Sequence, residues 1–240
     1  MSTSLQNSGP KPTPDLTTPL PRRAFLRYTG ASMAVTGLLI AGCDKDSTNS
    51  DPSTVDVGSG DVGVLNYAYA LEQLEAAFYA QVLQGSYFSG ATAGEKQILQ
   101  DLAYHETIHR DFLKAAITAA GGTPIKDLEP DFSAIDFSSK TSVLSAAKTF
   151  EDTGVAAYNG AGKLIQSADY LTIAGKIVSV EARHSALIRD IIQNGTFVDS
   201  TIVNLETGTE MSKNPPEIAL AVAPYLKDGS KLNVSNLPTD

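Results

Sequence analysis

Apolar residues recur every three to four positions in four long segments of the chain, and this period predicts four amphipathic α-helices. The predicted helices cover residues 62–84, 95–120, 140–167 and 170–194. In the second of them Leu99, Leu102, Leu113 and Ile117 fall on one face. Each segment therefore has a face that can be buried against the other three.

The connections between the predicted helices differ in length, and the lengths indicate how the helices pair. Residues 85–94 and 166–169 are short turns, which make consecutive helices antiparallel neighbours. Residues 123–139 contain Pro124 and Pro130, show no helical period and are long enough to cross the bundle. We therefore predict an all-α fold, a four-helix bundle of two helical hairpins joined by one long crossover.

The C-terminal segment, residues 196–240, is mostly irregular and rich in Asn, Thr and Pro. One short helix is predicted at residues 215–224, where two prolines precede an apolar run. We expect this tail to wrap a bundle that occupies residues 62–195.

Composition and charge exclude several classes of protein. The formal net charge of -9 provides no basic surface for phosphates, which argues against a nucleic-acid-binding protein. The single cysteine, Cys43, excludes an internal disulfide framework and a thiolate-rich metal site. Any bound metal ion would therefore have oxygen and nitrogen ligands.

The N-terminal segment reads as a leader followed by a linker. Arg22 and Arg23 precede a short apolar run that ends in Ile-Ala-Gly-Cys43, and these features resemble a twin-arginine export signal and a bacterial lipobox. We expect a signal in residues 1–43, lipidation of Cys43 and a flexible linker in residues 44–61. The expected location is the periplasm or cell envelope, with a lipid anchor in the membrane. The alternative is a chance cysteine, or cleavage without lipidation.

Acidic residues and histidines interrupt the apolar faces of the four predicted helices. The first and third helices each carry one inward glutamate, and the second and fourth each carry a Glu-x-x-His pair on one face. The set is Glu72, Glu106, His109, Glu151, Glu181 and His184. Four unpaired buried carboxylates would cost far more than the roughly 5–15 kcal/mol of a small domain's stability. Two divalent cations would balance them, and iron or manganese suits this donor set, with zinc as another ion that could bind.

Two neighbouring residues are alternatives for roles at this site. Glu75 is one turn from Glu72 and could replace it, but Tyr79 lies two turns after Glu72, and this spacing favours Glu72. Glu75 is then expected behind the ligands or on the surface. We expect His105 in one of the same two positions, behind the ligands or on the surface. The simpler interpretation of both Glu–His pairs is a surface contact, against which the inward apolar stripes argue.

Two nine-residue stretches, Leu-Glu-Gln-Leu-Glu-Ala-Ala-Phe-Tyr79 and Phe-Glu-Asp-Thr-Gly-Val-Ala-Ala-Tyr158, resemble the ferritin-like superfamily. Within it they resemble the ferritin-like-domain family that includes desiccation-related proteins, over about residues 62–195. The resemblance implies the same six ligands, with Glu106 and Glu181 more central between the helices. It also implies that Tyr79 and Tyr158 each hydrogen-bond a ligand from the opposite half, although both could be core aromatics only.

The resemblance implies a class of activity as well as a fold. The superfamily includes ferroxidases, peroxidases, manganese catalases and oxygenases, so the expected substrates are O2 or peroxide. The alternative is a non-catalytic structural or stress-protective protein, since some desiccation-related members have no established activity. An iron-storage cage is disfavoured by the lipid tether and the long tail. A homodimer is a possible assembly of the chain. Any electron donor would be a separate molecule, because the chain has no rubredoxin-like cysteine motif.

Overall fold

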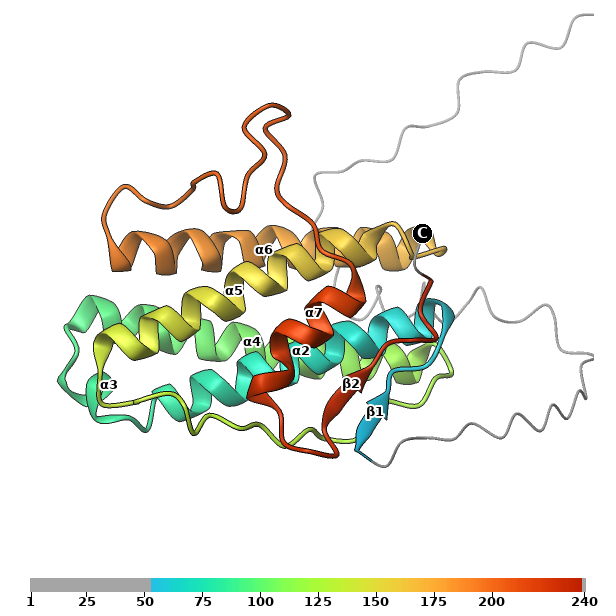
Figure 1. Cartoon of the computed structure of the whole chain (residues 1–240), viewed down its shortest axis with the longest axis horizontal. Coiled ribbons are helices and arrows are strands. Elements are labelled where there is room, and N and C mark those ends of the chain that lie inside the picture. The colour runs from blue at the N-terminus through green and yellow to red at the C-terminus, as the bar shows by residue number, and fades with distance from the viewer. Residues whose placement is uncertain (1–52, 239–240) are drawn as a thin grey trace, which may run out of the picture. The chain divides into compact units, whose positions relative to one another are not determined.

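The computed structural model describes residues 53–238, and this part of the chain is a bundle of four long helices. The elements, in chain order, are β1 (Thr54–Asp56), α2 (Gly60–Val82), α3 (Ser86–Gly90), α4 (Ala93–Ala119), α5 (Lys140–Gly162), α6 (Ala168–Ile192), α7 (Pro215–Val222), the 3-10 helix η1 (Ala223–Tyr225) and β2 (Lys231–Asn233). The all-α prediction is confirmed, including the short helix in the tail (Figure 1). Residues 1–43 with Cys43 lie outside the described residues, as does the first part of the expected linker.

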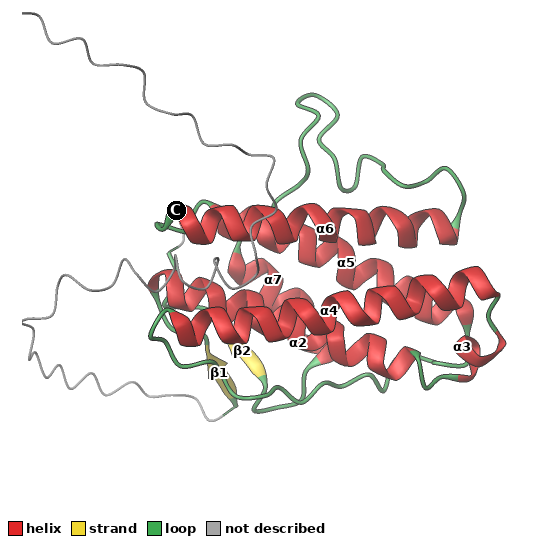
Figure 2. Ribbon diagram, turned by 180° about the vertical axis from the view of Figure 1, so that it is seen from behind, coloured by secondary structure: helices red, strands yellow, loops and turns green. Residues whose placement is uncertain are grey.

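The four long helices pack as two hairpins, as the loop lengths predict. The most extensive contacts are those of α2 with α4 and of α5 with α6, and α2 also packs against α5. Residues 120–139 form the long crossover between the hairpins. In two views from opposite sides, α7 lies across α2 and α5, whereas α4 and α6 face the other side of the bundle (Figures 1 and 2).

Side chains cap the helices where the chain enters them. Thr92 and Glu95 form a capping box at the start of α4, and Asn214 and Glu217 form another at the start of α7. Helix α5 ends at Gly162 rather than at the predicted residue 167. The Asp61 carboxylate accepts hydrogen bonds from the backbone N–H groups of Gln166 and Ser167. These two bonds hold the residues after Gly162 in a turn.

Two buried amides on α2 hold the crossover against the bundle. The Asn66 side chain accepts a hydrogen bond from the Ile125 N–H at 3.0 Å and donates one to the Thr123 carbonyl at 3.1 Å. Gln73 accepts one from the Leu128 N–H at 2.8 Å. These bonds satisfy backbone groups that lack a helix or strand partner, so a long irregular connection can pack on the core.

The chain immediately before α2 is ordered, contrary to the expectation of a flexible linker up to residue 61. Strand β1 pairs in parallel with β2 from the tail, with Val55 opposite Leu232. Val55 and Val57 are buried. Burial of these apolar side chains and the pairing of backbone groups fix both ends of the described chain beside the bundle.

The tail between α6 and α7 is tied to the bundle by a buried arginine. Arg189 on α6 is 2% exposed and donates to the Asp152 carboxylate of α5 from two nitrogens, at 2.7 and 2.9 Å. A third nitrogen donates to Asp199 of the tail at 2.8 Å. The guanidinium therefore joins the second hairpin to the segment that leaves it.

The described residues contain no helix with the length and apolarity required to span a membrane.

Candidate metal centre

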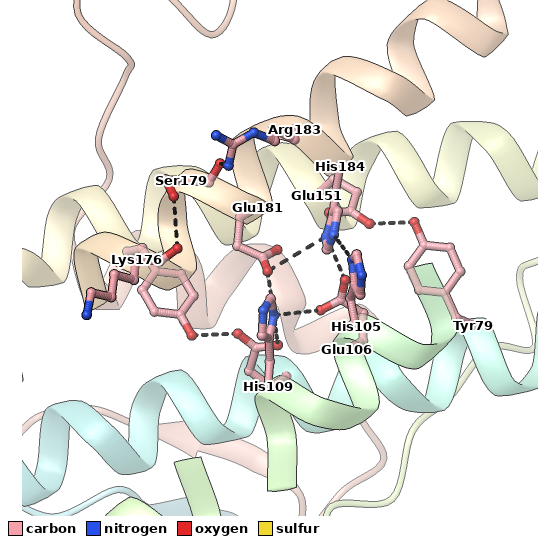
Figure 3. Close-up of polar contacts among 12 residues, drawn as sticks. Tyr79, His105, Glu106, His109, Glu151, Lys176, Ser179, Glu181, Arg183 and His184 are labelled. Carbon is pink, nitrogen blue, oxygen red and sulfur yellow. Dashed lines mark hydrogen bonds and ion pairs between the residues drawn. The ribbon is translucent and has the colours of Figure 1, made fainter. Parts of the chain in front are cut away.

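Six side chains from the four long helices converge in the middle of the bundle. They are Glu72 on α2, Glu106 and His109 on α4, Glu151 on α5, and Glu181 and His184 on α6. The four carboxylates are completely buried. His184 is 4% exposed and the His109 side chain 12%, which makes His109 the most accessible of the six. All six residues are those that the sequence predicts, and Figure 3 shows the convergence from α4 and α6.

The six residues form two groups whose potential ligand atoms lie within 4.8 Å of one another. One group is Glu72, Glu106, His109 and Glu181, and the other is Glu106, Glu151, Glu181 and His184. Glu106 and Glu181 belong to both groups. Their position between two clusters is the one that the resemblance implies.

The two hairpins contribute to the site in matching ways. His109 Nδ1 lies 2.7 Å from a Glu181 oxygen, and His184 Nδ1 lies 2.8 Å from a Glu106 oxygen. Each histidine thus approaches the glutamate of the other hairpin. The antiparallel pairing of α4 with α6 brings the two Glu-x-x-His motifs together in this reciprocal way.

Two tyrosines hold the remaining two carboxylates. The Tyr79 hydroxyl on α2 donates a hydrogen bond to Glu151 Oε1 on α5 at 2.5 Å (Figure 3). The Tyr158 hydroxyl on α5 donates one to Glu72 Oε1 on α2, also at 2.5 Å. Each tyrosine therefore contacts a carboxylate of the opposite hairpin, as the resemblance implies, and fixes which carboxylate oxygen faces the site.

Eight buried atoms of these six residues form no hydrogen bond of suitable geometry among the described residues, although some of them lie within ion-pair distance of one another. They are Glu72 Oε2, Glu151 Oε2, both carboxylate oxygens of Glu106 and of Glu181, and the Nδ1 atoms of His109 and His184. Buried polar atoms are almost always satisfied, so this concentration requires an explanation. Oxygen and nitrogen lone pairs that point toward a common position, without forming hydrogen bonds, are typical of side chains that bind a cation. The donor set therefore fits two metal ions.

Without metal, burial and charge change the proton affinities of these groups. Burial raises the pKa of Glu151 to about 8 and that of Glu72 well above its ordinary value. Burial also opposes ionisation of Glu106, but the adjacent His109 and His184 outweigh it and lower the pKa of Glu106 to about 2. Two classes of carboxyl group result, one protonated and one ionised near neutral pH.

The imidazoles respond in the opposite direction. Burial disfavours the charged form of His109, but Glu106, Glu181 and Glu72 beside it raise its pKa to about 12. For His184 the carboxylates also outweigh burial and raise the pKa far above its ordinary value. Both histidines are therefore protonated in the metal-free protein, and each must lose its Nδ1 proton before that atom can bind a cation.

Glu75 is a fifth buried glutamate beside the site, so of the two positions expected for it, behind the ligands or on the surface, the structure shows the first. It is 3% exposed, and burial together with the nearby carboxylates raises its pKa well above the ordinary value. Space for it is provided by Gly154 on α5, where an added Cβ would lie 2.9 Å from Glu75 Oε1. The two halves differ at this point. Glu75 follows Glu72 by three residues, and Gly154 follows Glu151 by three.

His105 lies behind His184, which is one of the two positions expected for it. Its Nδ1 is 2.9 Å from His184 Nε2, and the two rings are stacked with centroids 5.1 Å apart. A hydrogen bond on Nε2 orients the His184 ring and places its Nδ1 toward the carboxylates. The sequence offers one signal for this role, the position of His105 directly before Glu106 on the same predicted helix.

The comparisons with known proteins agree with this geometry. No curated protein matches the chain. A family model described as ferritin-like domain matches residues 60–194, which is more than half of the chain. The matched segment runs from the start of α2 to just after the end of α6 and includes all six converging residues. The chain therefore belongs to the ferritin-like domain family.

Proposed function

We propose that the chain binds two iron or manganese ions in the middle of the bundle and reacts there with O2 or peroxide. The observation that carries this proposal is the pair of four-residue groups that share Glu106 and Glu181. In this proposal Glu106 and Glu181 would contribute to holding both ions. Glu72 with His109, and Glu151 with His184, complete the separate halves. Carboxylate and imidazole donors suit iron and manganese, and zinc could also bind.

Bound iron or manganese ions would supply electrons to O2 or peroxide. The chain's own residues set the conditions for that chemistry. Tyr79 and Tyr158 each occupy one oxygen of a carboxylate and leave the other free for an ion. Complete burial of the four glutamates excludes bulk water, which strengthens every charge interaction in the site.

The proposal includes export and a lipid anchor on Cys43, supported by the twin arginines Arg22 and Arg23 and by the lipobox-like sequence. Residues 44–53 would then connect the anchor to β1. Cys43→Ala, expressed in a bacterium with a twin-arginine pathway, is expected to move the protein from the membrane fraction to the soluble fraction. Retention of this variant in the membrane fraction would contradict the anchor.

The activity is tested by loading the full chain anaerobically with Fe(II) or Mn(II) and then adding O2 or hydrogen peroxide. We expect oxidation of the bound metal, observed by absorbance, and its loss in Glu106→Ala. Glu206→Gln is the matched control, because Glu206 is an exposed tail carboxylate away from the site. Metal binding without any reaction toward either oxidant would contradict the redox function.

That outcome would favour the second candidate, a non-catalytic structural or stress-protective protein. One observation supports this candidate. In the metal-free site two protonated histidines already lie beside the carboxylates, with His109 2.7 Å from Glu181 and His184 2.8 Å from Glu106. The charges are thus partly compensated without metal, and a stable metal-free bundle would serve as a scaffold.

A further inference from the structure

An apolar crevice enters the bundle beside the converging carboxylates and histidines. All four long helices and the turn after α5 contribute to its wall. The wall consists of aliphatic side chains and three tyrosines, with no charged or amide side chain. Its volume of about 20 Å³ is enough for one small molecule.

Helix geometry places the inner end of the crevice directly beside the site. Three of the helices that carry converging residues also carry a lining residue about one turn away, in the pairs Ala68 with Glu72, Leu113 with His109, and Ile177 with Glu181. One turn corresponds to a rise of about 5.4 Å. Tyr158 forms part of the same wall, and its hydroxyl donates to Glu72 at 2.5 Å. A molecule in the crevice would therefore lie one side chain away from Glu72.

The other end of the crevice reaches the surface. Ile165, Tyr170 and Ala174 of its wall are half-buried, whereas Leu113 and Ile177 are buried. The crevice thus extends from solvent, past the turn between α5 and α6, to side chains such as Tyr158 that contact the converging residues.

We propose that this crevice is the route by which O2 reaches the metal centre. The inference rests on the proposed function and narrows its substrate to O2. The volume excludes an acyl chain or any larger organic substrate. The apolar wall of the crevice favours O2 over hydrogen peroxide, because a hydrogen peroxide molecule carries two hydroxyl groups that require hydrogen-bond partners. Among the buried wall atoms of the described residues, only the Tyr67 hydroxyl is left without a partner. It can bond one hydroxyl group of peroxide, but the other would find no partner in the wall, so peroxide would enter at a cost that O2 does not incur.

The first test uses O2 itself and requires no metal. The metal-free full chain, labelled at its methyl groups, is studied by NMR under equal pressures of O2 and N2. Paramagnetic O2 is expected to enhance the relaxation of the Ala68 and Ile177 methyls more than that of Ile218, a completely buried residue outside the crevice. Equal relaxation at these three residues would overturn the proposal.

The second test blocks the outer end of the crevice. Ala174→Phe fills a half-buried wall position, and Ala186→Phe is the matched control, a half-buried alanine on the same helix outside the wall. With bound Fe(II), we expect Ala174→Phe to slow oxidation by O2 at least about tenfold and to leave oxidation by hydrogen peroxide unchanged. Ala186→Phe should change neither rate.

Equal slowing with both oxidants, or no slowing with O2, would overturn the O2 route while leaving the metal centre intact. A wild-type protein that binds Fe(II) but does not react with O2 would instead refute the proposed function, and the O2 route with it. The NMR measurement uses the wild-type chain and does not depend on the folding of any variant. It therefore tests the proposal even if Ala174→Phe folds poorly.

Discussion

At the scale of single residues, the tyrosine–glutamate contacts order the site. Glu72 and Glu151 each have one oxygen that accepts a hydrogen bond from a tyrosine, whereas the oxygens of Glu106 and Glu181 accept none from a tyrosine and lie beside His184 and His109. The tyrosines therefore distinguish the two carboxylates that belong to one group of potential ligands each from the two that belong to both groups.

Tyr158→Phe is expected to reduce the free energy of unfolding by about 1–3 kcal/mol, because Glu72 Oε1 would remain buried without its donor. Tyr87→Phe is the matched control. The Tyr87 hydroxyl is buried and has no partner among the described residues, so its removal should cost much less. Urea unfolding of the metal-free proteins provides the comparison, and an equal loss of stability in both variants would contradict the role of the Tyr158 hydrogen bond.

The proton affinities predict how the stability of the metal-free protein depends on pH. Burial raises the pKa of Glu151 from 4.5 to about 8. The contribution of this group to the free energy of unfolding is therefore complete below pH 4.5 and is lost as the pH rises through about 8. The pKa of His109 is raised from 6.5 to about 12, so its contribution also declines as the pH rises above 6.5. Glu106, with a pKa of about 2, contributes constantly above pH 4.5.

The melting temperature of the metal-free chain should therefore fall from pH 5 to pH 9. Bound cations replace the protons, so the metal-loaded chain should show a much smaller fall. Differential scanning calorimetry of both forms measures this. A melting temperature of the metal-free chain that rises over this interval would contradict the assigned protonation states.

At the scale of the elements, two glycines of α5 allow other parts of the chain to approach the helix. Gly154 provides space for Glu75. At Gly160 an added Cβ would lie 1.7 Å from the Lys213 carbonyl oxygen, and the Lys213 N–H donates to the Ala156 carbonyl at 3.0 Å. Gly160 thus allows the tail to pack directly on the backbone of α5.

Gly160→Ala should displace the tail from α5 and destabilise the protein by about 1–3 kcal/mol, as overpacking does. Gly162→Ala is the matched control, because an added Cβ there would meet its nearest atom, Leu171 Cδ1, at an ordinary distance of 3.8 Å. Hydrogen exchange of the Lys213 amide should accelerate in Gly160→Ala only. Unchanged exchange would show that the tail does not depend on this contact.

At the scale of the whole molecule, local periodicity was enough to predict what depends on one helix at a time. The four helices, the two Glu-x-x-His pairs and the spacing of Glu72 and Tyr79 are properties of single segments. The burial of Glu75 was not predictable in this way, because it depends on Gly154 in the other hairpin. The pairing of His105 with His184 likewise joins two hairpins.

The pairing of β1 with β2 could not be predicted either. Each strand has three residues, too few for a period, and the strands lie at opposite ends of the described chain. Such a contact depends on the bundle, which brings the two segments together.

The central claim is that the six converging residues bind two metal ions, and elemental analysis of the purified full chain tests it most directly. We predict about two Fe or Mn per chain, as in di-metal carboxylate bundles, and the loss of this metal in His109→Ala and in His184→Ala. Glu206→Gln should retain the wild-type content. Absence of metal from the wild-type chain, even after anaerobic loading with Fe(II) or Mn(II), would contradict the claim.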